Sequence, residues 1–121
     1  LSHHGRDKDK LEKIARIDKY HLTEFAYLLE KLASIPENGG RLLDNCMLMI
    51  GSGIGDGDRH NHDNLPVLMA GGGGGTIATG RHIKYAFDTP MTNLYRSMLT
   101  RVGAPVDEFS DSKGELDQLE G

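Results

Sequence analysis

Two short apolar runs flanked by glycines constrain the fold of this chain more than any other feature. The first, Cys46–Ile50, reads Cys-Met-Leu-Met-Ile, and the second, Leu65–Ala70, reads Leu-Pro-Val-Leu-Met-Ala. Neither run alternates with polar residues, which is typical of strands buried on both faces of a mainly parallel sheet. Pro66 fits only at the start of its strand, because proline donates no hydrogen bond to a neighbouring strand. We therefore expect an α/β fold.

Helical patterns surround these runs. Residues 7–34 place apolar side chains at steps of three and four, which predicts one long amphipathic helix that ends before Pro36. Asp88-Thr89-Pro90 predicts the start of a second helix, with Thr89 as its N-cap, that ends at Gly103. Residues 81–87 suit a short third strand. Because two helices accompany about three strands, we expect a region upstream of Leu1 to complete the sheet.

Length and charge limit the classes of protein to consider. With 121 residues, the chain is long enough for one domain at most. We expect residues 1–106 to form a single α/β domain or the C-terminal part of a larger one. Residues 107–121 are acidic and polar, which predicts a loosely held tail with Leu116 and Leu119 as docking points. A net charge of −4 without a basic stripe argues against nucleic acid as a partner. No apolar run approaches the roughly 20 residues of a transmembrane helix.

The loop between the two apolar runs carries the chemistry. Residues 51–63 read Gly-Ser-Gly-Ile-Gly-Asp-Gly-Asp-Arg-His-Asn-His-Asp, with Asp56, Asp58, His60 and His62 at every second position. If this segment is extended, all four side chains share one face. Two carboxylates and two imidazoles suit zinc or manganese better than calcium. A polar surface turn without a ligand is the alternative interpretation.

The N-terminus and the glycine run are two further candidate sites. Either His3 or His4 is a candidate to reach the loop, and only one is expected to, because adjacent side chains of an extended chain point in opposite directions. Ser2 beside these histidines has no built-in triad geometry. The five glycines from Gly71 to Gly75 lack the lysine of a phosphate-binding loop and the spacing of a dinucleotide fingerprint, which favours a flexible turn.

Two stretches resemble the HxxSHH family, which comprises bacterial proteins of unknown function that are predicted to be exported. The opening Leu-Ser-His-His-Gly is similar to the end of that family's His-x-x-Ser-His-His signature. Residues 51–66, with the glycine run that follows, are similar to its second block. The resemblance covers nearly the whole chain and implies an exported protein, periplasmic or extracellular, without assigning an activity.

The C-terminal half is also distantly similar to the alkaline phosphatase and sulfatase superfamily. The shared order is a hydrophobic strand, Asp56-Gly57, a later histidine (His60 or His62), a Pro-Val-Leu strand and an Asp-Thr-Pro helix start. This similarity implies the C-terminal portion of such a sheet with flanking helices. Two departures stand out, because Gly57 replaces a metal-binding histidine of the superfamily and its nucleophile lies outside this chain.

Two functional hypotheses follow from these features. In the first, Asp56, His60 and His62 hold a divalent ion, zinc or manganese, and Asp58 or His3 completes or orients the shell. The substrate is then a small phosphate or sulfate ester, and an upstream segment supplies the nucleophile. In the second, the chain is a non-catalytic exported protein that keeps the fold for binding or for a structural role, so whether it is an enzyme stays open.

Overall fold

The computed structural model describes residues 1–120, and its first element is the long helix predicted from the sequence. Helix α1 spans Lys8–Ser34, and the Asp7 side chain caps its N-terminus by accepting the Lys10 N–H. The helix stops before Pro36, as expected. Along α1, the apolar side chains that are half-buried lie on one face of the helix; they are Ile14, Phe25, Leu29, Leu32 and Ala33.

A small hairpin and one helical turn follow α1. Strands β1 (Pro36–Glu37) and β2 (Gly40–Arg41) pair antiparallel around Asn38-Gly39. Both turn residues have positive φ, which is the type I′ geometry that Asn-Gly favours. The one-turn helix α2, Leu42–Asn45, starts where Arg41 and Asp44 bond to each other in a capping box.

The two apolar runs form a hairpin and not a parallel pair. Strand β3 (Leu48–Gly51) pairs with β4 (Val67–Ala70) in antiparallel register, with Met49 opposite Met69. The expectation of parallel strands was therefore wrong, because the intervening segment turns back as a hairpin loop and not as a crossover helix. Pro66 lies just before β4, as expected. The chain is a mixed helix-and-strand protein, so the coarse fold class is confirmed.

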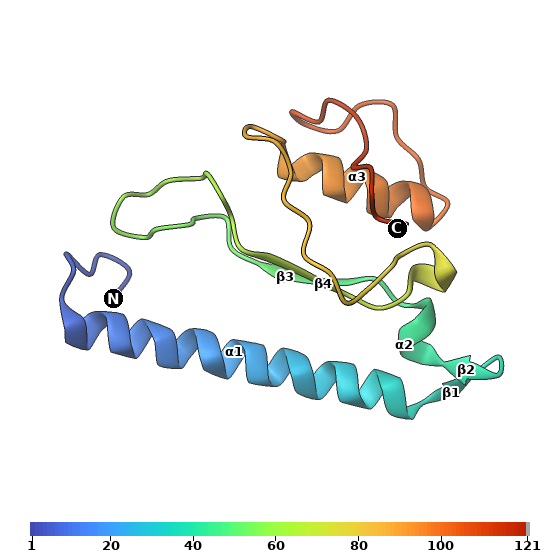
Figure 1. The fold of residues 1–121 in the computed structure, drawn as a ribbon, viewed down its shortest axis with the longest axis horizontal. Helices are drawn as coiled ribbons and strands as arrows, with labels where there is room; N and C mark the ends of the chain where they lie inside the picture. Colours follow the sequence, from blue (N-terminus) through green and yellow to red (C-terminus); the bar gives the residue numbers. More distant parts are fainter. Residues whose placement is uncertain (121) are drawn as a thin grey trace.

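The elements stack in three levels. Figure 1 shows α1 along one face of the β3–β4 hairpin and α3 (Met91–Arg101) beyond the other face. The predicted strand over residues 81–87 is absent, and the chain from Thr76 to Pro90 is mostly irregular. Helix α3 also begins slightly later than predicted, with Pro90 and not Thr89 as its N-cap.

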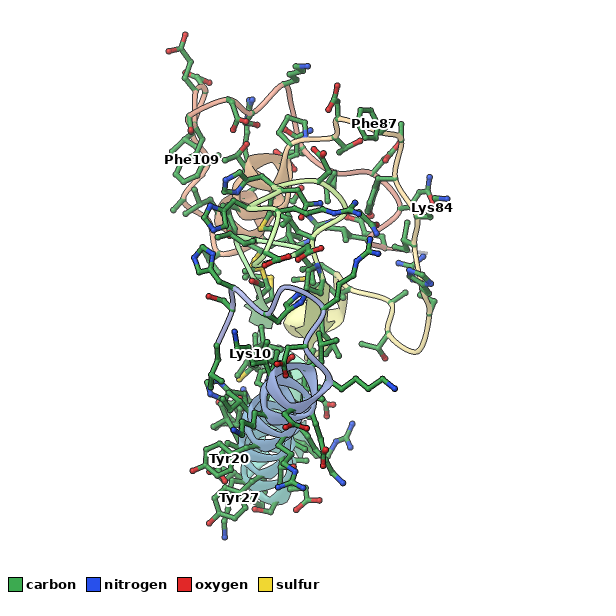
Figure 2. The ribbon with its side chains drawn as sticks, turned by 90° about the vertical axis from the view of Figure 1, so that its left-hand side faces the viewer. Lys10, Tyr20, Tyr27, Lys84, Phe87 and Phe109 are labelled. Atoms are coloured by element: carbon green, nitrogen blue, oxygen red, sulfur yellow. The ribbon has the colours of Figure 1, made fainter. Side chains whose placement is uncertain are left out.

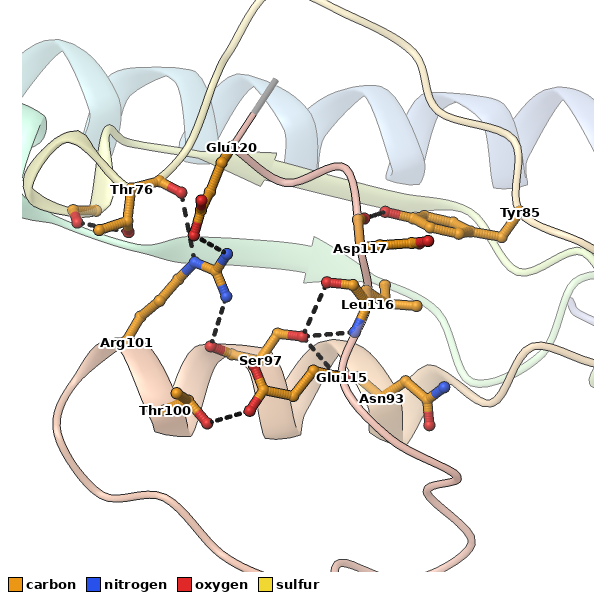
Figure 3. Close-up of polar contacts among 11 residues, drawn as sticks. Thr76, Tyr85, Asn93, Ser97, Thr100, Arg101, Glu115, Leu116, Asp117 and Glu120 are labelled. Carbon is orange, nitrogen blue, oxygen red and sulfur yellow. Dashed lines mark hydrogen bonds and ion pairs between the residues drawn. The ribbon is translucent and has the colours of Figure 1, made fainter.

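The C-terminal strap, which we define as residues 111–120, lies along α3 (Figure 3). Ser97 of α3 is fully buried and accepts the Leu116 N–H at 2.7 Å. Arg101 contacts Glu120 at 3.3 Å, and the Leu119 carbonyl accepts the Ala78 N–H. This packing differs from the loosely held tail that we expected, although Leu119 is a docking point with 7% of its surface exposed. Gly121 lies outside the described residues.

Few side chains of these elements are buried. Leu94 and Leu119 are the buried apolar side chains of the core, and α1 contributes no buried residue. Figure 2 shows the aromatic side chains of Tyr20, Tyr27 and Phe87 projecting away from the ribbon. Among residues 1–120, no helix combines the length and apolarity needed to cross a bilayer.

Candidate functional site

The N-terminal loop and the tip of the β3–β4 hairpin meet at one end of the molecule (Figure 1). The hairpin tip is a tight turn, closed by a bridge between Asp56 and Asn61 and by the Gly55 N–H, which donates to the Asn61 carbonyl at 2.9 Å. Gly57 lies directly against Ser2: a Cβ on Gly57 would be 2.8 Å from the Ser2 Cβ. The absence of a side chain at Gly57 therefore allows the two segments to approach.

His3 and His60 form the closest pair of potential metal ligands across this junction. Their Nε2 atoms are 3.3 Å apart, and the two rings are in an edge-to-face arrangement. His60 has a φ of 54°, a left-handed conformation that is uncommon for a residue with a side chain. Such backbone strain is concentrated at functional sites and turns. One neutral ring can donate to the other, or both nitrogens can share a cation.

His4 reaches the same loop, contrary to the expectation that only one of the two histidines would. The chain bends at this point, because the His4 N–H donates to the Ser2 carbonyl at 3.0 Å, so the rule for extended chains does not apply. The Nε2 atom of His4 lies 3.4 Å from Asp56 Oδ1, and its Nδ1 accepts the Arg6 N–H. In the neutral ring the proton is therefore on Nε2 and faces the carboxylate.

The carboxylates hold the turn together. The Asp58 N–H donates to Asp56 Oδ1 at 2.9 Å. This bond, with smaller contributions from the Arg59 backbone and the His4 ring, lowers the pKa of the Asp56 carboxyl below its ordinary value. Asp58 in turn accepts the Gly5 N–H at 3.0 Å, which ties the N-terminal loop to the hairpin tip.

His62 does not join the pair of histidines. Its Nδ1 lies 2.6 Å from the Gly53 carbonyl oxygen, a contact that braces the base of the loop. The predicted common face of Asp56, Asp58, His60 and His62 was wrong, because residues 57–60 form a turn and period-two geometry requires an extended segment. Among residues 1–120, no group of three or more His, Cys, Asp or Glu side chains is already arranged around an ion.

The first part of the glycine run is closely packed, whereas Gly74 and Gly75 have open space around them. A Cβ on Gly71 would overlap the Cys46 carbonyl oxygen, so the run fits closely against the C-terminal end of α2. Backbone carbonyls accept the N–H groups that a phosphate loop would present; those groups belong to Gly72, Gly73, Gly75, Thr76 and Ile77. Because these donors are already paired, the run does not offer a cradle for phosphate.

Two contributors to the cluster were missed or underrated in the sequence. His4 was set against His3 as an alternative, although both contact the loop. Arg59, with its Nε 3.8 Å from Asp56 Oδ2, places a largely exposed guanidinium beside the cluster. No local spacing signals the contacts of the N-terminal histidines, since they join segments more than 50 residues apart, whereas Arg59 lies only three residues from Asp56 and could have been considered from the sequence. Comparison of the chain with protein families, curated proteins and solved structures finds no match.

Proposed function

We propose that the junction of the N-terminal loop and the hairpin tip binds a divalent transition-metal ion, zinc or manganese, through His3 and His60. The observation that supports this proposal is the 3.3 Å separation of their Nε2 atoms. Two imidazole nitrogens bound to a tetrahedral zinc ion at 2.0–2.1 Å are separated by about 3.3 Å. The pair therefore has the spacing of two zinc ligands before any side chain moves.

The remaining coordination comes from the carboxylates and from water. Asp56 is the third ligand in this proposal, reached by rotation of its side chain, and the His4 Nε2–H then orients its second oxygen. Asp58 keeps its bond to the Gly5 N–H and positions the loop. A site with three protein ligands and water in the fourth position is the arrangement found in catalytic zinc centres.

The chemistry that fits this site is hydrolysis of a small phosphate or sulfate ester, as the superfamily resemblance implies. An ion at the cluster would polarise an ester oxygen, and the exposed Arg59 guanidinium is close enough to contact the same anionic group. In this proposal, an upstream region of the same exported protein supplies the nucleophile.

A non-catalytic exported protein that keeps the fold is the second candidate. Its support is Gly57, which replaces the metal-binding histidine of the superfamily. The close contact between Gly57 and Ser2 leaves no room for an imidazole with the N-terminal loop in its present place. A chain that had lost this ligand could retain the loop as a binding or structural element.

Metal content tests the site directly. We expect about one transition-metal ion per chain in protein purified without chelator, and its loss in His3→Asn and in His60→Asn. Asparagine is chosen at position 60 because it tolerates the left-handed backbone there. His21→Asn, which removes an exposed imidazole from α1, is the matched control and should retain the ion. Absence of metal from the wild type, or equal loss in the control, would refute the site.

Turnover separates the two candidate functions. The protein with its upstream region should hydrolyse an aryl phosphate or an aryl sulfate, and Asp56→Ala should abolish this activity while the protein stays folded. Metal binding without turnover of either ester would favour the non-catalytic candidate.

A further inference from the structure

One backbone edge of β3 is unpaired in the described part of the chain. Strand β3 bonds to β4 alone, and no other backbone group of residues 1–120 donates to or accepts from Leu48, Met49 or Ile50. An edge strand with unpaired N–H and C=O groups is a template for another strand. Natural edge strands usually carry lysine, proline or a bulge that prevents such pairing. The run Cys46–Ile50 contains no charged residue and no proline.

An apolar groove lies beside this strand on each of its faces. Ile50 lines a groove of about 320 Å³ with Tyr20, Phe25 and Leu28 of α1. Met47 lies just before β3 and three residues from Ile50, so the two side chains point to opposite faces of the extended chain. Met47 lines a groove of about 410 Å³ with residues that include Tyr95, Met98 and Phe109. A strand added to the edge would send successive side chains into the two grooves in turn.

One lining residue of each groove projects to the same side of the molecule. Figure 2 shows Tyr20 and Phe109 projecting to one side, at the levels of α1 and of the C-terminal segment respectively. Tyr20 is 63% exposed, although it stands beside the apolar groove. Large aromatic side chains at this degree of exposure are typical of interfaces.

The accessible surface indicates how large the missing contact is. A compact protein of 13.3 kDa exposes about 6,500 Å², whereas this chain exposes 8684 Å². The excess is roughly 2,200 Å² per chain, which exceeds the 800 Å² per partner of a standard interface; for two chains it is about 4,400 Å², within the range of obligate dimers. The chain therefore has enough open surface for an extensive homodimer.

We propose that the free edge of β3 pairs antiparallel with β3 of a second copy about a two-fold axis. The segment that fits the edge must be short, extended, uncharged and apolar on both faces, and Cys46–Ile50 is such a segment. A two-fold contact brings identical surfaces together, so each copy covers the grooves of the other. The product is a four-stranded sheet with both α1 helices on one face and both α3 helices on the other.

This pairing leaves the candidate metal centres separate. Antiparallel β3 strands direct the two hairpin tips to opposite ends of the sheet, so the cluster around His3 and His60 stays exposed in each copy. The dimer and the metal site are therefore independent, and the failure of either proposal leaves the other intact.

Sedimentation equilibrium of the 121-residue chain tests the proposal. We expect a mass of twice 13.3 kDa, and Tyr20→Lys should weaken dimerisation at least about 30-fold, as for a tyrosine hot spot. Phe87→Lys is the matched control, because Phe87 is 80% exposed, is not among the residues lining either groove, and should leave the dimer unchanged.

Amide hydrogen exchange shows whether β3 itself is the contact. In the wild type, amides of β3 should become protected as the protein concentration rises, and this protection should be lost in Tyr20→Lys. A monomeric wild type would overturn the proposal. A dimer that Tyr20→Lys does not weaken, without concentration-dependent protection of β3, would also overturn it.

Discussion

Removal of the Ser97 hydroxyl tests whether the C-terminal strap is an integral part of the fold. Ser97 is 0% exposed, and its Oγ accepts the Leu116 N–H at 2.7 Å while it donates to the Asn93 carbonyl at 3.0 Å (Figure 3). In Ser97→Ala, the Leu116 N–H loses this acceptor inside the interface between strap and helix. The strap would then be held by Leu119, by the half-buried hydrogen bonds that Ser112 and Lys113 donate to the Asn93 side chain, and by contacts at the surface.

The size of the effect follows from the position of this hydrogen bond, which joins the fully buried Ser97 hydroxyl to the N–H of the half-buried Leu116. A buried donor without a partner costs about 1–3 kcal/mol, whereas the loss of an exposed hydrogen bond costs far less. We therefore expect Ser97→Ala to lower the free energy of unfolding by about 1–3 kcal/mol. At roughly 4 °C per kcal/mol for a chain of this size, the melting temperature should fall by about 4–12 °C.

Urea unfolding followed by circular dichroism measures this change, and Thr100→Ala is the matched control. Thr100 lies on the same helix and bonds to Glu115 of the same strap, but this hydrogen bond is exposed. Its removal should change the free energy of unfolding by no more than about 0.5 kcal/mol. The Leu116 amide should exchange faster in Ser97→Ala alone. Equal destabilisation by both variants, or unchanged exchange at Leu116, would refute this account of the strap.

Three further predictions concern other parts of the molecule. Gly71→Ala should destabilise the fold by at least about 2 kcal/mol in urea unfolding, because φ is 94° and its Cβ would overlap Cys46, whereas Gly53→Ala, with open space around it, should be near neutral. Leu119→Ala should cost about 2–5 kcal/mol by the same assay. The folded pKa of Asp56 is lowered, so its contribution to stability is present above about pH 4 and is lost as the pH falls through the folded value. Acid titrations of unfolding should therefore show the gap between wild type and Asp56→Asn narrowing below pH 4.

Local patterns predicted the two longer helices and the two apolar strands, because each of these elements depends on residues close in sequence. The period of α1 and its end before Pro36 can be read directly, and the apolar runs locate β3 and β4 to within two residues. Asn38-Gly39 specifies the turn between β1 and β2, because Asn-Gly favours the type I′ geometry. This hairpin, which we did not expect, is therefore also encoded locally.

Strand direction and the third strand depend on distant contacts. An apolar run has the same composition in a parallel or an antiparallel sheet, so the sequence of β3 does not decide between them. The expected burial of both strands on both faces was also wrong, because no residue of β3 or β4 is buried. Residues 81–87 have a plausible strand composition but no neighbour to pair with. Instead, the Tyr85 hydroxyl donates to the Asp117 carbonyl at 2.8 Å and helps to hold the strap.

The candidate site combines local and long-range information in a similar way. Asp56, Asp58 and His60 stand out by their clustering, and all three lie at the junction. The partners that give the cluster its geometry are His3 and His4, which come from the N-terminus, more than 50 residues away in the sequence. Their arrival depends on the close approach of Ser2 to Gly57, which a glycine in a loop does not by itself predict.

The position of the cluster connects metal binding to the docking of α1. This helix has no buried residue. Apart from the contacts of its apolar face, it is attached to the rest of the molecule at its two ends. The C-terminal end continues into β1 and α2, whereas the N-terminal end is held by His3, His4 and Gly5 on the hairpin tip. An ion shared by His3 and His60 would therefore add its binding free energy to the attachment of the helix, because folding and metal binding are linked wherever ligands come from separate segments. The same histidines would then govern both the chemistry of the site and the order of the N-terminal loop.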